Sequence, residues 1–139
     1  MSINKFNPEG YHDPTPYEAL TNIIKEEKES YLPLVYIASP FAGDTERNTE
    51  RARGYCRLAV SKGYIPLAPH LLYPQFMDDE DKKQRELGLR FALTLLGKCD
   101  ELWVFGERIS HGMAQEIAKA KKRNMPIRYF DSKCEEVSL

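Results

Sequence analysis

Four short apolar runs, of which only the last is interrupted, by Arg128, constrain the fold of this chain more than any other feature of its sequence. They cover residues 33–38, 64–68, 102–105 and 126–130. Runs of this length without polar alternation are typical of strands that are buried on both faces of a parallel sheet. Segments with apolar residues at helical spacing separate them, so the sequence predicts the order β-α-β-α-β-α-β.

Each connecting segment shows one apolar face of a helix. The first face ends before Gly63, the second belongs to a helix that starts near Asp79, and Ser110 caps the third helix. The three predicted faces are Ala52, Tyr55, Cys56, Ala59 and Val60; Gly88, Phe91, Ala92, Leu95 and Leu96; and Met113, Ala114, Ile117 and Ala118. With right-handed crossovers, this order predicts a doubly wound, flavodoxin- or Rossmann-like α/β fold. Its parallel sheet has four to five strands, with helices on both faces.

Two terminal segments flank this α/β domain of residues 33–130. Residues 1–32 are expected to form a polar arm and a helix from about residue 16 to 30. Thr15 would cap this helix, with Pro16 in its first position and Glu18 completing the cap. Its thin apolar stripe is expected to pack on the domain or on a partner subunit. Residues 131–139 are expected to be a polar tail.

Composition narrows the classes of function. The net charge of the 139-residue chain is −1 and its pI is about 6.3, so it lacks the basic excess with which proteins usually bind duplex nucleic acid. No apolar run approaches the roughly 20 residues of a membrane span, and the first residues lack the apolar core of a signal peptide. We therefore expect no membrane partner and a cytoplasmic protein. The three cysteines suggest neither a disulfide framework nor a zinc site, and we expect no cofactor.

Three loops should meet where ligands bind in such sheets, outside the carboxyl ends of the strands. They cover residues 39–48, 69–77 and 106–112. In the first loop, Gly43 lets the backbone approach a ligand just before a helix N-terminus, which favours an anion. The simpler reading is an ordinary loop in which Asp44 or Thr45 caps the helix.

The second loop is too apolar for a plain connection. His70, Tyr73 and Phe76 could wall a pocket, since aromatic rings stack on nucleobases. The same apolar side chains could instead cover the sheet or a subunit interface, and a single histidine such as His70 is more often structural than catalytic.

The third segment places a carboxylate one turn into a helix. Ser110 and Gly112 lie at the helix start, where a phosphate can sit, and Glu116 follows on the same side. From there its carboxylate can face the strand ends. The alternative is a solvated glutamate paired with Lys119.

Taken together, these segments resemble the nucleoside 2-deoxyribosyltransferase superfamily. The strand and loop YIASPF (residues 36–41) look like its opening half, and CDELWVF (residues 99–105) followed by S-x-G-M-A-x-E (residues 110–116) looks like its closing half. The S-x-G-x-x-x-E spacing is shared with the 2′-deoxynucleoside 5′-phosphate N-hydrolases of that superfamily. The chain also looks like an uncharacterised bacterial and phage-borne branch. The resemblance covers about residues 33–130.

The resemblance implies roles for individual residues. Glu116 matches the family's nucleophile. Ser110 and Gly112 match the residues that bind the 5′ end of the sugar in the family. The loop around base and sugar is matched by Tyr36, Ser39, Phe41 and Gly43. Asp44, Asn48, His70, Tyr73 and Met113, from the same three segments, complete the candidate substrate-binding set. The family's aspartate near the base has no clear counterpart; Asp44, Asp78 and Asp79 are candidates. The loop 69–77 is also more apolar than is usual in the family.

The activity implied is cleavage or transfer at the N-glycosidic bond of 2′-deoxynucleosides or their 5′-monophosphates. A glutamate nucleophile, no metal, and a homodimer or higher homo-oligomer belong to that expectation. Two alternatives stay open: a nucleotide-binding sensor of the same fold without turnover, and a small interaction protein. The sequence leaves open the base, the phosphorylation of the sugar, the acceptor and the second acid–base group.

Overall fold

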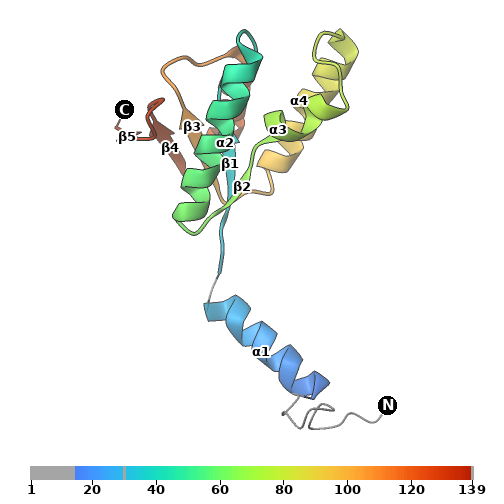
Figure 1. Cartoon of the computed structure of the whole chain (residues 1–139), viewed down its shortest axis with the longest axis vertical. Coiled ribbons are helices and arrows are strands. Elements are labelled where there is room, and N and C mark those ends of the chain that lie inside the picture. Colours follow the sequence, from blue (N-terminus) through green and yellow to red (C-terminus); the bar gives the residue numbers. More distant parts are fainter. Residues whose placement is uncertain (1–14, 30, 139) are drawn as a thin grey trace. The chain divides into compact units, whose positions relative to one another are not determined.

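The computed structural model describes residues 15–29 and 31–138, and of residues 23–29 it describes the backbone alone. The chain divides into two units, Met1–Tyr31 and Leu32–Leu139. In the first unit, helix α1 (Pro16–Glu29) begins with the predicted capping box (Figure 1). The amide of Glu18 donates to the Thr15 hydroxyl and the amide of Thr15 donates to the Glu18 carboxylate, each at 3.2 Å. The predicted stripe of α1 falls partly on Ile23 and Ile24, whose side chains lie outside the description.

The second unit is built on a five-stranded sheet in the order β2-β1-β3-β4-β5. The parallel strands are β1 (Leu34–Ala38), β2 (Ile65–Leu67), β3 (Glu101–Phe105) and β4 (Ile127–Phe130), which match the four apolar runs to within two residues at each end. Tyr36 is paired with Leu102 in β3, so the two central strands end side by side. The predicted doubly wound fold is confirmed.

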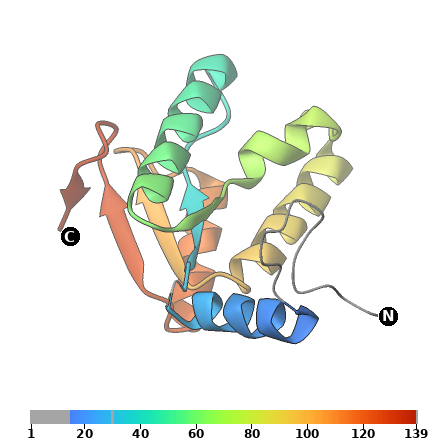
Figure 2. The ribbon, with the colours of Figure 1, turned by 60° about the horizontal axis from the view of Figure 1, so that its bottom comes forward.

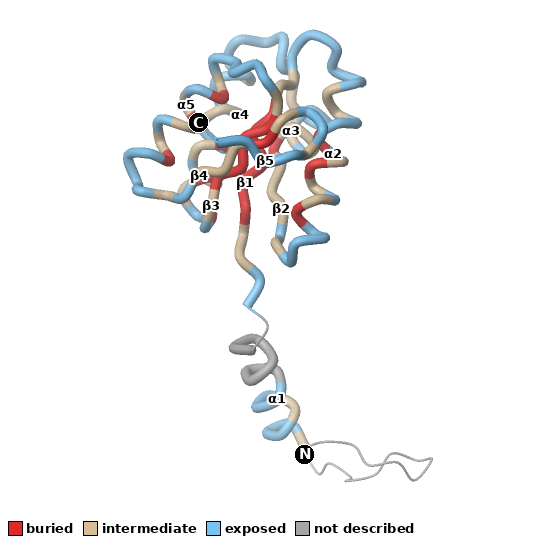
Figure 3. Tube along the Cα trace, turned by 90° about the vertical axis from the view of Figure 1, so that its left-hand side faces the viewer, coloured by how far each residue is buried: buried red, intermediate tan, exposed pale blue. Residues whose placement is uncertain are grey.

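Helices cover both faces of the sheet (Figure 2). Helix α2 (Thr45–Ser61) packs on one face, where Tyr55 and Ala59 contact Val35 and Ile37. Helices α4 (Lys82–Leu96) and α5 (His111–Lys122) pack on the other. Burial is therefore greatest in the two central strands, β1 and β3 (Figure 3). Among the described residues, no helix is long and apolar enough to cross a bilayer.

Two segments differ from the sequence prediction. Residues 69–77 are not a simple loop: helix α3 (Pro69–Leu72) leads into the 3₁₀ turn η1 (Tyr73–Gln75). Proline in the first turn of each starts them, because it needs no amide partner there. The expected tail folds back as β5 (Glu136–Val137), antiparallel to β4.

All three predicted helix faces were incorrect in part; on α4 the exception is Phe91, which is 38% exposed. On α5 the buried side chains are Met113, Glu116 and Ala120, with Ile117 partly buried, whereas Ala114 and Ala118 are exposed. The buried side of α5 therefore includes Met113 as predicted, but it continues through the carboxylate of Glu116 instead of through Ala114 and Ala118. On α2, Val60 is 63% exposed; it lies in the last turn of the helix, which ends at Ser61.

Candidate functional site

The carboxyl ends of β1 and β3 open into a cleft of about 940 Å³. The chain leaves β1 towards α2 on one face of the sheet and leaves β3 towards α5 on the other, so this is the switch point of the fold. All three segments singled out in the sequence line the cleft, together with the first turns of α4.

Seven of the twelve candidate residues line this cleft, and five do not. The seven are Phe41, Gly43, His70, Tyr73, Ser110, Gly112 and Glu116. The other five are Tyr36, Ser39, Asp44, Asn48 and Met113. Tyr36, Ser39 and Met113 are buried, which places them behind the cleft wall rather than on it.

Glu116 is the central feature of the cleft. Its side chain is 2% exposed, and its Oε2 atom has no hydrogen-bond partner within the described part of the chain. Burial raises the pKa of this carboxyl group to about 8, because the charged form loses its hydration. The alternative of a solvated glutamate paired with Lys119 is wrong, since the Lys119 ammonium donates instead to the Leu93 carbonyl.

Tyr36 lies next to this carboxylate, below the cleft floor. Burial raises the pKa of its phenol, and the neighbouring Glu116 raises it further. The same contact acts on Glu116 in the opposite direction and lowers its pKa. Yet neither the Tyr36 hydroxyl nor Glu116 Oε2 completes a hydrogen bond of normal geometry among the described residues. Two buried polar atoms thus face each other without full satisfaction, an arrangement that is rare in packed interiors and common at functional sites.

The N-terminus of α5 forms the wall nearest to Glu116. The Ser110 hydroxyl accepts a hydrogen bond from the amide of Met113 at 3.2 Å and so caps the helix as predicted. Met113 itself is a core residue. Arg108, two residues before the cap, also lines the cleft. Backbone amides and a guanidinium at a helix N-terminus favour an anionic group here.

The first loop lines another part of the cleft and is held by its own helix. The Asn48 side-chain amide donates to the carbonyls of Phe41 and Ala42 at 3.1 and 3.2 Å. Asp44 accepts from the amide of Arg47 at 3.2 Å and caps α2, as the simpler reading of this loop proposed. Gly43 has a φ of +99°, which side-chain-bearing residues rarely adopt. Asp44 and Asn48 therefore shape the loop from outside the cleft.

An aromatic pair continues this wall. The rings of Phe41 and His70 are parallel to within 5°, with centroids 5.1 Å apart. Burial lowers the pKa of His70, and the nearby Asp79 partly opposes this effect. His70 is therefore neutral at pH 7 and presents an aromatic surface with one N–H donor.

Several cleft residues were absent from the sequence-based set. Arg85 and Arg108 bring positive charge, and Gln84 and Gln115 bring amides. Asp78 and Asp79, two of the three candidates for the aspartate near the base, also line the cleft, whereas the third, Asp44, does not. Position in the loop after β3 could have indicated Arg108, but nothing in the sequence marked Arg85. The described residues contain no group of three or more His, Cys, Asp or Glu side chains that could hold a metal ion.

Comparison with known proteins agrees with this architecture. The family model of a domain of unknown function, DUF7768, matches residues 33–130. No match was found among curated proteins. Among solved structures, the 2-deoxyribosyltransferase from the psychrotolerant bacterium Bacillus psychrosaccharolyticus aligns with a TM-score of 0.56 and 18% sequence identity, over 76% of this chain and 77% of that chain. The alignment confirms the fold expected from the sequence resemblance. The chain belongs to the DUF7768 family and has a 2-deoxyribosyltransferase-like fold.

Proposed function

We propose that this protein cleaves or transfers the N-glycosidic bond of 2′-deoxynucleosides or their 5′-monophosphates, with Glu116 as the nucleophile. The observation that carries the proposal is the buried carboxylate of Glu116, whose Oε2 has no hydrogen-bond partner among the described residues, in a cleft at the switch point of the sheet. A carboxylate that is kept from water and has only the Tyr36 phenol beside it is available to a ligand. The 2-deoxyribosyltransferase of the same fold supports the choice of substrate class.

The proposed reaction has two steps. The Glu116 carboxylate attacks C1′ of the sugar while the bond to the base breaks, which gives a glycosyl ester on the enzyme and a base that needs a proton. Water or a second base then attacks C1′ and releases the carboxylate. Positive charge on the sugar in each transition state is stabilised by that carboxylate. His70, Asp78 and Asp79, which also line the cleft, are the candidates for proton transfer to the base.

The cleft also suggests where the parts of the substrate would lie. The Phe41–His70 pair offers a flat surface for the base. The N-terminus of α5, with Arg108, would take the 5′ end; the helix begins five residues before Glu116, about 7.5 Å along its axis at 1.5 Å per residue. That spacing suits a 5′-phosphate on a sugar whose C1′ contacts Glu116.

Base release from deoxynucleosides and deoxynucleotides tests the proposal. We expect Glu116→Gln to lower the rate at least about 10³-fold, because a carboxamide is a poor nucleophile. Glu86→Gln, which changes an exposed carboxylate lining the same cleft, is the matched control and should stay close to wild type. Unchanged turnover in Glu116→Gln would exclude this nucleophile.

Ser110→Ala separates the two substrate classes. Loss of the cap loosens the amides that would hold a phosphate, so 5′-monophosphates should lose more affinity than the corresponding nucleosides. An equal loss for both classes would contradict a phosphate seat at α5.

The second candidate function is a nucleotide sensor without turnover. The pKa of about 8 favours it in one respect, because a neutral Glu116 can donate a hydrogen bond to a ligand at neutral pH. Calorimetry distinguishes the two functions: tight nucleotide binding without base release, retained in Glu116→Gln, would identify a sensor.

We also propose that the protein self-associates. Leu72, Phe76, Leu87 and Phe91 are 38–65% exposed; Leu72 belongs to α3, Phe76 follows η1 directly, and the other two belong to α4. An apolar surface of this kind is typical of protein interfaces. Light scattering should give at least twice the 16.1 kDa of one chain, and Phe76→Glu should shift the mass towards the monomer.

A further inference from the structure

The first turn of α5 carries a histidine to which the proposed function gives no role. His111 is the first residue of the helix, between Ser110 and Gly112, and it lines the cleft together with both of them. Its side chain is attached to the stretch of backbone that we propose as the binding site of the 5′ end. The imidazole therefore lies at that site by covalent connection.

The backbone at this helix start has free hydrogen-bond donors. Ser110 accepts from the amide of Met113 with its hydroxyl, at 3.2 Å, and from the amide of Ala114 with its carbonyl, at 2.9 Å. The amides of His111 and Gly112 have no acceptor within the part of the chain that the structure describes. A Cβ atom at Gly112 would meet nothing within 4 Å, so the space beside it is open. An anion can reach these free amides from the cleft.

Glu116 indicates independently that this end of α5 takes a ligand. Its side chain is 2% exposed and lines the cleft one turn beyond Gly112, yet its Oε2 has no hydrogen-bond partner among the residues described. A buried polar atom without a partner is rare in a packed interior and is explained when a ligand supplies the partner. Free amides and an unsatisfied carboxyl group thus lie on the same helix and line the same cleft.

Gln115 holds the imidazole of His111. It lines the cleft one turn later on the helix, and its amide Nε2 lies 2.8 Å from Nε2 of the ring. Because an amide nitrogen can only donate, the ring nitrogen accepts, and the proton of the neutral ring is on Nδ1. This N–H has no acceptor among the described residues. A half-turn of the Gln115 amide would present its oxygen instead, so the same pair suits a protonated ring.

The charges at this site favour a protonated ring when a phosphate is bound. A phosphate monoester carries about −1.5 to −2 charges at pH 7. Arg108 supplies one positive charge, the N-terminus of α5 supplies about half of one, and the Glu116 carboxyl group, with a pKa of about 8, is mostly neutral. The other charged groups that line the cleft are Arg85, Glu86, Asp78 and Asp79. Acidic groups outnumber basic ones among them, which also favours an imidazolium.

We infer that His111 binds the 5′-phosphate of the ligand in its protonated form, so that binding of a 5′-monophosphate is coupled to the uptake of one proton from solvent. The inference rests on the proposed function only for the place of the 5′ end, and it requires no bond cleavage. It names 5′-monophosphates, rather than nucleosides, as the ligand class. Affinity for them should fall as the pH rises, so the ionisation of Glu116 is best followed with nucleosides, which do not engage His111.

Calorimetry with 2′-deoxynucleosides and their 5′-monophosphates tests this coupling. Both ligands are titrated into Glu116→Gln, which should release no base and has no titrating carboxyl group, and into the double variant with His111→Gln. A pH of about 7.5 is used, because the free phosphate has then lost its second proton. We expect the monophosphate to bind more tightly than the nucleoside, and this advantage to fall about tenfold without His111, the loss of one charge-assisted hydrogen bond.

The same titrations in buffers of different ionisation enthalpy measure the proton. Monophosphate binding should take up more protons than nucleoside binding, and the difference should disappear with His111→Gln. Lys121→Gln, which removes an exposed cation from the last turn of the same helix, is the matched control and should change neither quantity.

The outcomes separate this inference from the proposed reaction. An affinity advantage that persists in His111→Gln, equal losses for both ligands, no additional proton uptake, or no binding of the monophosphate would each overturn the role of His111. Whether the wild type releases base is measured separately and decides the proposed reaction alone. His111 is exposed and lies outside the Ser110 cap, so His111→Gln should fold like the wild type.

Discussion

The burial of Glu116 lowers the free energy of unfolding, and the size of this effect depends on pH. Its pKa in the folded protein is about 8, against an ordinary value of 4.5, because burial disfavours the charge. A raised folded-state pKa means that its contribution to stability is fully present below pH 4.5. That contribution is lost as the pH rises towards 8, since the unfolded chain ionises first. A catalytic or binding role explains why a carboxylate is kept where an apolar residue would be more stable.

Glu116→Gln should remove this pH dependence. Glutamine has similar size but no charge to lose, so the variant should become more stable than wild type as the pH rises from 4.5 to 8, on the order of a few kcal/mol. Thermal or denaturant unfolding of both proteins across this range measures the difference, in which the titration of other groups such as His70 cancels. A constant difference would show that Glu116 titrates normally.

The same pKa predicts the pH profile of the proposed reaction. Only the ionised carboxylate can attack, so kcat/KM should rise up to tenfold per pH unit below pH 8 and level off above it. The wild-type rate between pH 5.5 and 9.5 measures this profile. A flat profile between pH 6 and 8 would argue against a buried Glu116 as nucleophile in the free enzyme.

At the scale of elements, loops shape the cleft through contacts made by their helices. Asn48, in the first turn of α2, holds the carbonyls of Phe41 and Ala42 and so fixes the turn that carries Phe41 into the cleft. Helix α2 thus acts on the cleft wall without lining it.

Asn48→Ala should loosen this turn. Loss of the two hydrogen bonds should cost about 1–2 kcal/mol of unfolding free energy and should weaken ligand binding, because Phe41 is no longer held against His70. Denaturant unfolding and calorimetry with a deoxynucleotide measure the two effects. Thr49→Ala, the next residue of the same helix, is the control; an equal effect there would mean that helix propensity rather than the clamp is responsible.

The sequence predicted the regular elements better than the irregular ones. Apolar runs located the four parallel strands, and capping residues such as Thr15 and Ser110 located two helix starts, because these signals are local. Residues 69–77 were not predicted as helical, since so short a segment carries no periodicity. Glu116 was placed correctly in the cleft by its spacing from Ser110, but its burial was not evident, because a charged residue on a helix is usually exposed.

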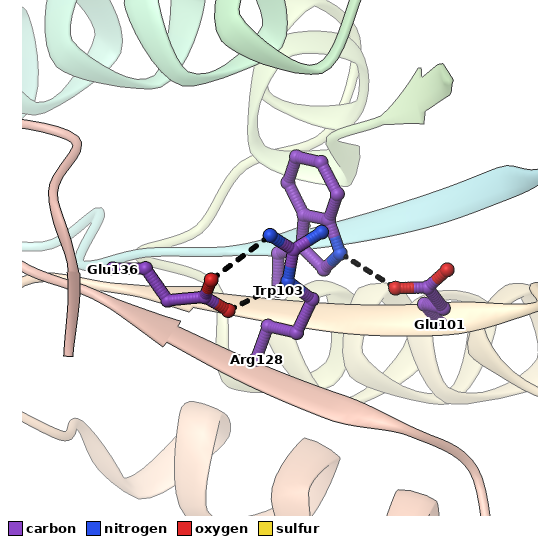
Figure 4. Close-up of polar contacts among 4 residues, drawn as sticks. All are labelled: Glu101, Trp103, Arg128 and Glu136. Atoms are coloured by element: carbon purple, nitrogen blue, oxygen red, sulfur yellow. Dashed lines mark hydrogen bonds and ion pairs between the residues drawn. The ribbon is translucent and has the colours of Figure 1, made fainter. Parts of the chain in front are cut away.

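At the scale of the whole molecule, the cleft and the far edge of the sheet are held by different interactions. At that edge, the Arg128 guanidinium lies over the Trp103 ring (Figure 4), 4.8 Å from its centre. It also lies 5.4 Å from the centre of the Phe130 ring. Arg128 is paired with Glu136 of β5 at 2.6 Å, and the Trp103 indole donates to Glu101 at 3.0 Å. This arrangement keeps Trp103 fully buried on a sheet face that α2 covers only in part.

Arg128→Ala should therefore weaken the fold without changing the site. We expect a loss of about 1–3 kcal/mol from lost packing and cation–π contact, and a red shift in fluorescence as Trp103, the single tryptophan, meets water. Glu136→Gln should affect stability much less than Arg128→Ala, because Glu136 faces solvent, which screens the ion pair. Nucleotide affinity should persist in both variants while they are folded; its loss would link the edge to the cleft.

The short helical stretch α3–η1 contributes no strand to the sheet, yet it supplies a large part of the cleft wall. Recognition of the ligand and construction of the scaffold are thus assigned to different stretches of chain. Relatives could diversify the compounds they accept by exchanging residues 69–77 alone, while the strands and the helix bearing the carboxylate stay as they are. The same nine residues form a natural module for transplanting ligand preference from one such protein to another.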